Sequence, residues 1–138
     1  MKNEILITHL NSILAEDGYT LKAEYSTNDN DIKVIVVQET SGLKQVFYGD
    51  IDPLYNYFNI EIFGDNIESE YKTAKKIGDL IGTTAYVDIQ DSSGIKTWEI
   101  IFKQYTNPRT IQYYDIRRVS YTMTLQVVIS KISESSSS

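Results

Sequence analysis

Acidic side chains in two loops are the first candidates for chemistry in this sequence of 138 residues. Asp50 and Asp52 flank Ile51 and could face together as a pair, one carboxyl donating a proton and the other accepting it. The run Asn28 to Asp31 offers oxygen ligands, but it lacks the Gly and the distant Glu of a calcium-binding loop. Because Asn and Asp commonly form turns, we interpret this run as a solvated turn.

The remaining chemistry-bearing residues are few. The chain contains one histidine and no cysteine, which excludes disulfides and thiolate metal sites and fits a reducing compartment. His9 lies at the edge of an apolar helical stripe, where a packed or surface role is more common than that of a base or ligand. No nucleophile or phosphate-loop motif occurs. The sequence therefore predicts a non-enzymatic protein without cofactor or metal, and an enzyme using Asp50 and Asp52 is the alternative.

Basic and tyrosine residues concentrate in the segment 103–118, although the whole chain has a net charge of −6. This segment holds four basic residues against Asp115 alone. Such a mixture can follow a nucleic-acid strand, can form a protein interface, or can be an exposed hairpin arm with solvated charges. We favour the protein interface because the acidic net charge opposes phosphate binding. The expected oligomer-interface residues are Tyr105, Arg109, Tyr113, Tyr114, Arg117 and Arg118.

Two amphipathic helices must help to position these residues. The first is expected to start at a cap on Asn3 and to end at Gly18, which suits a left-handed C-cap. The second is expected to start with a capping box of Asp65 and Glu68 and to end at Gly82. The buried stripes are Leu6, Leu10, Ile13 and Leu14 in the first helix, and Ile67, Tyr71, Ala74, Ile77 or Gly78, and Ile81 in the second.

Alternating apolar and polar residues predict that most of the remaining chain is strand. The last strand has the clearest period, with Val128 the only apolar residue on its polar face, and it is longer than usual. We therefore expect one α+β domain over residues 1–132, a mostly antiparallel sheet with two helices packed on it, a projecting hairpin arm, and a disordered serine-rich tail at 133–138. The expected strands are 21–25, 32–38 (central), 43–48, 55–63, 85–89, 97–105 and 119–129, with a hairpin turn at 91–94.

The order of these elements resembles that of the tail-terminator proteins of long-tailed bacteriophages, which belong to the minor capsid or tail-completion proteins. The stretches that carry the resemblance are 59–64 (NIEIFG), 71–74 (YKTA), 98–102 (WEIIF), 104–108 (QYTNP) and 117–125 (RRVSYTMTL). They look like the family's strand-then-helix unit, its hairpin arm and its closing strand. The resemblance covers the chain well from about residue 50 onward, and the first 50 residues by element order.

The resemblance implies a structural virion protein that forms a ring, usually a hexamer, on the finished tail tube. Its implied partners are a second copy of itself, the tail tube protein and a head-completion protein, with DNA only in transit through the channel. It also implies a place in the tail or neck of the virion, assembled in the host bacterial cytoplasm. No apolar run is long enough for a membrane span, so we expect a soluble protein. The alternatives are another neck or head-completion protein, or a monomeric protein-binding module that uses an exposed sheet edge.

Overall fold

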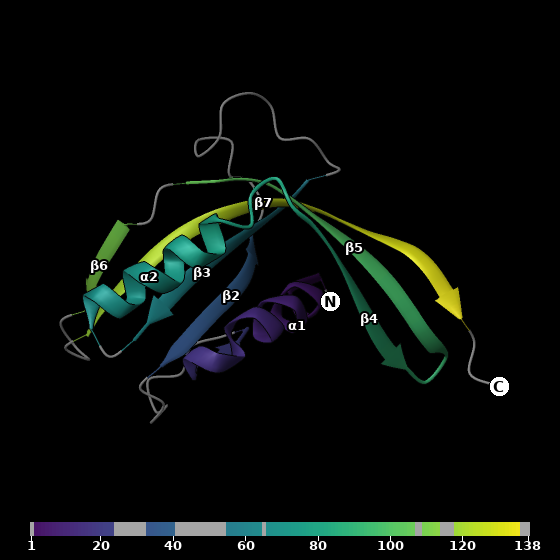
Figure 1. Ribbon diagram of the computed structural model, residues 1–138, viewed down its shortest axis with the longest axis horizontal. Coiled ribbons are helices and arrows are strands. Elements are labelled where there is room, and N and C mark those ends of the chain that lie inside the picture. Colours follow the sequence, from purple (N-terminus) through teal and green to yellow (C-terminus); the bar gives the residue numbers. More distant parts are fainter. Residues whose placement is uncertain are drawn as a thin grey trace.

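The structure is a computed structural model that describes residues 2–23, 33–40, 55–64, 66–106, 109–113 and 118–135. These residues form a curled sheet with two α-helices (Figure 1). This arrangement confirms the predicted α+β class with a mostly antiparallel sheet. The elements are α1 (Lys2–Leu14), the 3-10 helix η1 (Ala15–Asp17), β1 (Thr20–Lys22), β2 (Val34–Thr40), β3 (Asn56–Phe63), α2 (Ile67–Gly78), β4 (Thr84–Asp91), β5 (Gly94–Tyr105), β6 (Arg109–Tyr113) and β7 (Arg118–Ser135).

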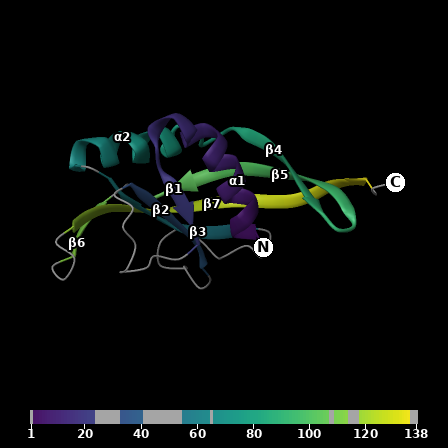
Figure 2. The same ribbon diagram turned by 90° about the horizontal axis from the view of Figure 1, so that it is seen from below.

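Strand β7 organises the sheet. The described strands lie in the order β1-β2-β3-β7-β5-β4, with β6 also paired to β7. β7 is 18 residues long and runs almost the full length of the molecule (Figure 2). It pairs with β3 through residues 121–127, with β5 through residues 125–135 and with β6 through residues 118–122. Because a strand has only two edges, β5 and β6 follow one another along the edge of β7 opposite β3.

The hydrophobic core lies on the face of the sheet that carries both helices. Alternate residues of β7 from Met123 to Ile129 point to this face, as the period-two pattern predicts. Figure 1 shows α1 on the concave side of the curled sheet, between β2 and β4. The core side chains from the helices and from the sheet form one cluster: Ile5, Leu6, Leu10, Leu14, Tyr19, Ile35, Val37, Phe58, Ile60, Ile62, Ala74, Ile77, Val87, Ile100, Phe102, Met123, Leu125, Val127 and Ile129.

Helix α1 follows the sequence prediction except at its start. Leu6, Leu10 and Leu14 are fully buried, and Ile13 packs against the core as a partly buried side chain. Gly18 has a φ of 77°, the left-handed conformation expected of it, and it ends the short η1 turn that extends the helix. The predicted cap on Asn3 is wrong, because α1 already includes Lys2 and Asn3 lies within the helix.

Helix α2 begins later than predicted, and it buries a different face from the predicted one. Its N-cap is Asn66, whose side-chain Oδ1 accepts a hydrogen bond of 2.9 Å from the Ser69 amide, so the predicted box on Asp65 and Glu68 is wrong. Asp65 itself lies outside the described residues. The predicted stripe is also wrong in part, because Ile67 and Tyr71 are half exposed, at 49% and 50%.

A buried carboxylate explains the rotation of α2. Glu70 is 2% exposed, and its Oε1 accepts a hydrogen bond of 2.8 Å from the Gly64 amide. That bond offsets part of the cost of burying the carboxylate and turns Glu70 and Thr73 inward, in place of Ile67 and Tyr71. The helix ends at Gly78 rather than at Gly82. Gly82 lies in the following turn with a φ of 87°, and its amide donates to the Phe102 carbonyl oxygen at 2.9 Å.

The strand predictions are mostly confirmed. The central position of the strand at 32–38 holds for β2, and the predicted 55–63, 85–89 and 97–105 correspond to β3, β4 and β5. Three segments differ: the strand at 21–25 shortens to β1, the part of the chain after residue 108, where no strand was expected before 119, contains β6, and β7 runs to Ser135, three residues into the predicted disordered tail. The predicted strand 43–48 and the turn at 28–31 lie outside the described residues.

Candidate assembly surfaces

The aromatic residue at the end of β5 does not form part of an arm. Tyr105 pairs with Leu125 of β7, so its side chain lies on the helix-bearing face of the sheet. A Cβ added at Gly78 of α2 would lie 3.1 Å from the Tyr105 ring, which means that the ring packs closely on the end of the helix. Tyr105 is still 38% exposed, but its main contact is with its own chain.

Three of the other expected interface residues lie at the opposite end of the molecule from the C-terminus. Arg109 begins β6, is exposed and pairs with Thr122. Tyr113 and Arg118 face each other across the β6–β7 pair, where only their backbones are described. Tyr114 and Arg117 lie outside the described residues. The structure therefore places Arg109, Tyr113 and Arg118 on the β6–β7 pair, and β6 lies at one end of the molecule in Figure 1. The β7 partner of Arg109, Thr122, is three residues from the partner of Tyr105, Leu125.

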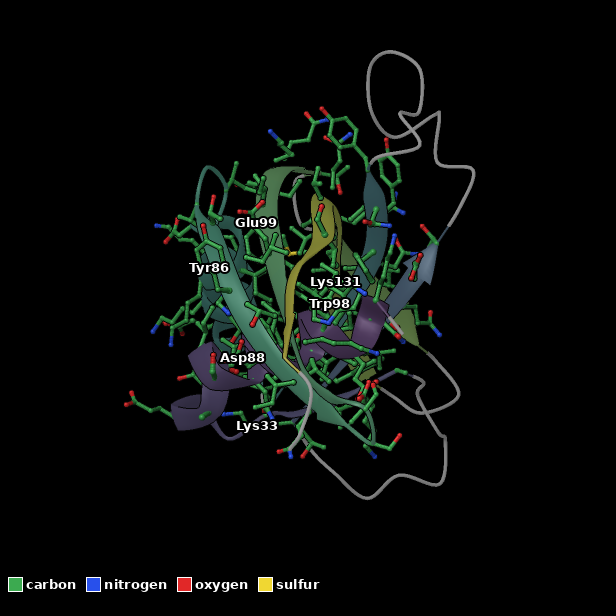
Figure 3. The ribbon with its side chains drawn as sticks, turned by 90° about the vertical axis from the view of Figure 1, so that its right-hand side faces the viewer. Lys33, Tyr86, Asp88, Trp98, Glu99 and Lys131 are labelled. Carbon is green, nitrogen blue, oxygen red and sulfur yellow. The ribbon has the colours of Figure 1, made fainter. Side chains whose placement is uncertain are left out.

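A second exposed surface lies at the other end, on what we call the wing: β4, β5 and residues 128–135 of β7. One side of the wing covers the core with Val87, Ile100 and Ile129. The register places alternate residues on the outer side, among them Tyr86 opposite Glu99 of β5. Figure 3 shows Trp98 and Lys131 beside α1, with Tyr86 and Glu99 on the other side of the strands. The large apolar side chains exposed on the wing are Tyr86 (62%), Ile95 (42%) and Ile132 (49%). The register places Tyr86 and Ile95 on the outer side, and Ile132 is the unpaired residue of β7 at the register shift opposite Thr97 and Trp98.

The outer edge of the wing is also open. Within the described part of the chain, β4 pairs with β5 and with no other strand. Its edge therefore presents backbone donors and acceptors that another chain can pair with. Charged groups accompany this edge: Asp88 accepts a 2.6 Å hydrogen bond from the Thr97 hydroxyl, and Glu99 lies on the neighbouring strand. The outer side of the wing is thus apolar with acidic neighbours.

The start of α2 provides a matching surface at the far end, which we call the α2 end: Ile67, Tyr71 and Tyr121. Ile67 and Tyr71 are half exposed, and the rings of Tyr71 and Tyr121 are 5.9 Å apart. Two basic side chains, Lys72 and Lys75, follow this pair on the exposed face of α2, whereas Arg109 pairs with Thr122 and therefore lies on the other face of the sheet from Tyr121. Glu68 is the acidic neighbour and forms a largely solvated pair with Lys72 at 3.4 Å.

Sequence reasoning missed both apolar surfaces. Val128 was the one apolar residue noted at a polar position of β7, and Tyr86 falls at a polar position of β4. These positions were the sequence features that could have indicated the exposed apolar surface of the wing. Ile67 and Tyr71 were assigned to the buried stripe of α2, so their exposure was hidden until the helix orientation was known.

The structure describes only some of the candidate catalytic and metal-binding groups. Asp50 and Asp52 lie outside the described residues. Among the residues that the structure describes, no group of three or more His, Cys, Asp or Glu side chains could hold a metal ion. In the same part of the chain, no helix combines the length and apolar character that a membrane span requires.

His9 makes stability depend on pH. Its ring lies 5.8 Å from that of Phe102, and partial burial lowers the pKa of His9 below its ordinary 6.5. The unfolded chain therefore binds this proton more readily than the folded chain does. The contribution of neutral His9 is complete above about pH 6.5 and is lost as the pH falls below it. We expect His9→Leu to lose less stability than the wild type between about pH 7.5 and 5.5 in urea unfolding. An equal loss in both proteins would contradict this assignment.

Comparisons with protein-family models, with curated proteins and with solved structures found no match to this chain.

Proposed function

We propose that this protein is a self-assembling structural subunit that forms a ring, as the tail terminators of long-tailed bacteriophages do. The observation that carries the proposal is the pair of exposed apolar surfaces at opposite ends of one chain. The wing has acidic neighbours in Asp88 and Glu99, whereas the α2 end has basic neighbours in Lys72 and Lys75. The two surfaces therefore complement each other in charge and share an apolar centre.

Two different surfaces on one chain favour a ring over a twofold dimer. In a twofold dimer the same patch meets itself, and one of the two surfaces would stay uncovered. When the wing of one copy meets the α2 end of the next, every copy uses both surfaces, and a suitable rotation closes the ring. Tyr86, Ile132 and Tyr71 are of the kinds that supply most of the binding energy when water is excluded around them.

The resemblance in sequence supplies the biological setting of the proposal. In that setting the ring caps the tail tube, stops its polymerisation and contacts the head-completion complex, and the protein resides in the virion. DNA then passes through the ring without being bound, and the net charge of −6 suits a channel that repels a polyanion. No enzymatic step is part of this function.

The mass of the purified protein at several concentrations tests the proposal. Light scattering is expected to give a closed oligomer, with six copies as the first expectation, and negative-stain imaging is expected to show rings. When tail tubes of a long-tailed phage are added, the rings are expected at one end of each tube. A monomer at all concentrations up to about 1 mM, the range of weak specific association, would contradict the assembly. Rings that do not bind tail tubes would support the assembly but contradict the proposed position on the tail.

The open edge of β4 favours one other function. A monomeric module could bind an extended peptide as an added strand on Thr84–Asp91, because that edge has no described strand partner. If the protein is instead another neck or head-completion protein, it would still self-assemble, but its ring would bind a partner other than the tail tube. The light-scattering experiment separates the monomeric module from both assembling proteins.

A further inference from the structure

A small cavity lies on the core-facing side of the wing, where the first turn of α1 meets the strands. It has a volume of about 180 Å³. Its apolar lining residues are Ile5, Ile89 and Trp98, and its charged ones are Glu4, Asp91, Lys96 and Lys131. Figure 3 shows Trp98 and Lys131 beside α1, with Tyr86 on the other side of the strands. The cavity is therefore separate from the outer side of the wing.

The apolar side chains of the cavity come from three different elements. Ile5 of α1 is 2% exposed, whereas Ile89 of β4 and Trp98 of β5 pack against the core and are only partly buried. Because α1 begins at Lys2, the helix ends beside these two side chains and leaves part of their apolar surface uncovered. A ligand that covers this surface gains the free energy of removing it from water.

The charged side chains that line the cavity balance one another. The Lys96 ammonium and the Asp91 carboxylate form an ion pair of 2.9 Å, and Glu4 and Lys131 add one charge of each sign. A ligand with a net charge would lose its water here without meeting a surplus of the opposite charge. The lining therefore favours a neutral ligand, with an apolar body and a polar group that can hydrogen bond to the charged side chains.

We propose that this cavity binds a small neutral aromatic molecule with one six-membered ring and one polar substituent. An apolar protein cavity of about 150 Å³ takes up benzene, so a cavity of about 180 Å³ accommodates such a molecule. The indole of Trp98 offers an aromatic surface for offset or edge-to-face contact, which favours an aromatic over an aliphatic ligand. The proposal does not depend on subunit assembly, since every lining residue belongs to one chain.

Titration of the full-length protein with phenol tests this site. Trp98 is the only tryptophan of the chain, so the single indole N–H signal in NMR spectra reports on the cavity. This signal is expected to shift saturably, with half-saturation at about 1 mM, a modest affinity for a ligand of so few atoms. Benzoate and benzylammonium carry a charge on a similar ring and are expected to bind at least about tenfold more weakly than phenol.

Ile89→Phe separates ligand binding from folding, because the larger side chain occupies the cavity and stays apolar against the core. This variant is expected to remain folded and to bind phenol at least about tenfold more weakly than the wild type. The matched control is Ile101→Phe, at a partly buried position of β5 that does not line the cavity, and it is expected to bind like the wild type.

Three results would overturn the proposal. The first is the absence of a saturable shift of the indole signal in the wild type, which needs no variant to fold. The second is tighter binding of benzoate or benzylammonium than of phenol, which would contradict the neutral ligand class. The third is a change in phenol binding that is the same in Ile89→Phe as in Ile101→Phe, which would place the binding elsewhere.

Discussion

Tyr86→Glu combined with Ile132→Glu is expected to convert the assembled protein into a monomer. Both side chains are exposed on the wing, so the substitutions leave the core of the subunit intact. In the assembly they replace two apolar contacts, each worth about 1.5–3 kcal/mol, by carboxylates that must lose their water. At about 1.4 kcal/mol per tenfold, the dissociation constant should rise by at least about 100-fold. Sedimentation or light scattering over a concentration series measures this change.

A matched control adds the same two negative charges elsewhere. Asn11→Glu with Ala15→Glu changes two exposed residues near the end of α1, away from both assembly surfaces. This variant should assemble like the wild type, which would show that position rather than net charge matters. If the wing variant stayed folded and assembled as strongly as the control, the wing would not be part of the contact.

Phe102→Ala is expected to destabilise the subunit by about 3–5 kcal/mol, the usual cost of removing a fully buried aromatic side chain. Phe102 is 0% exposed and lies where β5 meets α1, against the His9 ring. Its backbone also ties the turn after α2 to the sheet, because its amide donates to the Thr83 carbonyl oxygen at 3.1 Å. The substitution leaves that backbone bond and creates a cavity at the junction. Urea unfolding of the monomeric wing variant, with and without Phe102→Ala, measures the effect free of assembly.

Two comparisons make the Phe102 result specific. Phe102→Leu retains most of the buried volume and should cost less than half as much as Phe102→Ala. Ile101→Ala changes the neighbouring residue, which is only partly buried, and should also cost less. A loss below about 1 kcal/mol for Phe102→Ala would mean that this junction can collapse around the cavity, contrary to its close packing.

The fold was predictable wherever a single periodic pattern decided the structure. The alternation from Val119 to Ile129 predicted β7 because one face of the strand is buried and the other is polar. Leu6, Leu10 and Leu14 predicted the buried face of α1 for the same reason, at helical spacing. β6 escaped prediction because its few residues form a strand by pairing along β7, which is a long-range contact that no local pattern reports.

The orientation of α2 escaped prediction because hydropathy alone favours burying Ile67 and Tyr71. In the structure a hydrogen bond between Glu70 and the Gly64 amide reverses that preference. The same reversal exposes the aromatic pair of Tyr71 and Tyr121. Because the sequence pattern assigned Tyr71 to the buried face of α2, it did not indicate this assembly surface. The wing surface depends on the pairing of β4 with β5 and of β5 with the end of β7, and the sequence does not specify these neighbours.

A mixing experiment tests most directly whether two different surfaces meet. One variant carries Tyr86→Glu and Ile132→Glu and retains only the α2 end, and the other carries Ile67→Glu and Tyr71→Glu and retains only the wing. Each variant alone should be a monomer, whereas an equimolar mixture should form a dimer of one copy of each and nothing larger, as measured by native mass spectrometry. A mixture that remains monomeric, or a single variant that dimerises with itself, would contradict the head-to-tail contact.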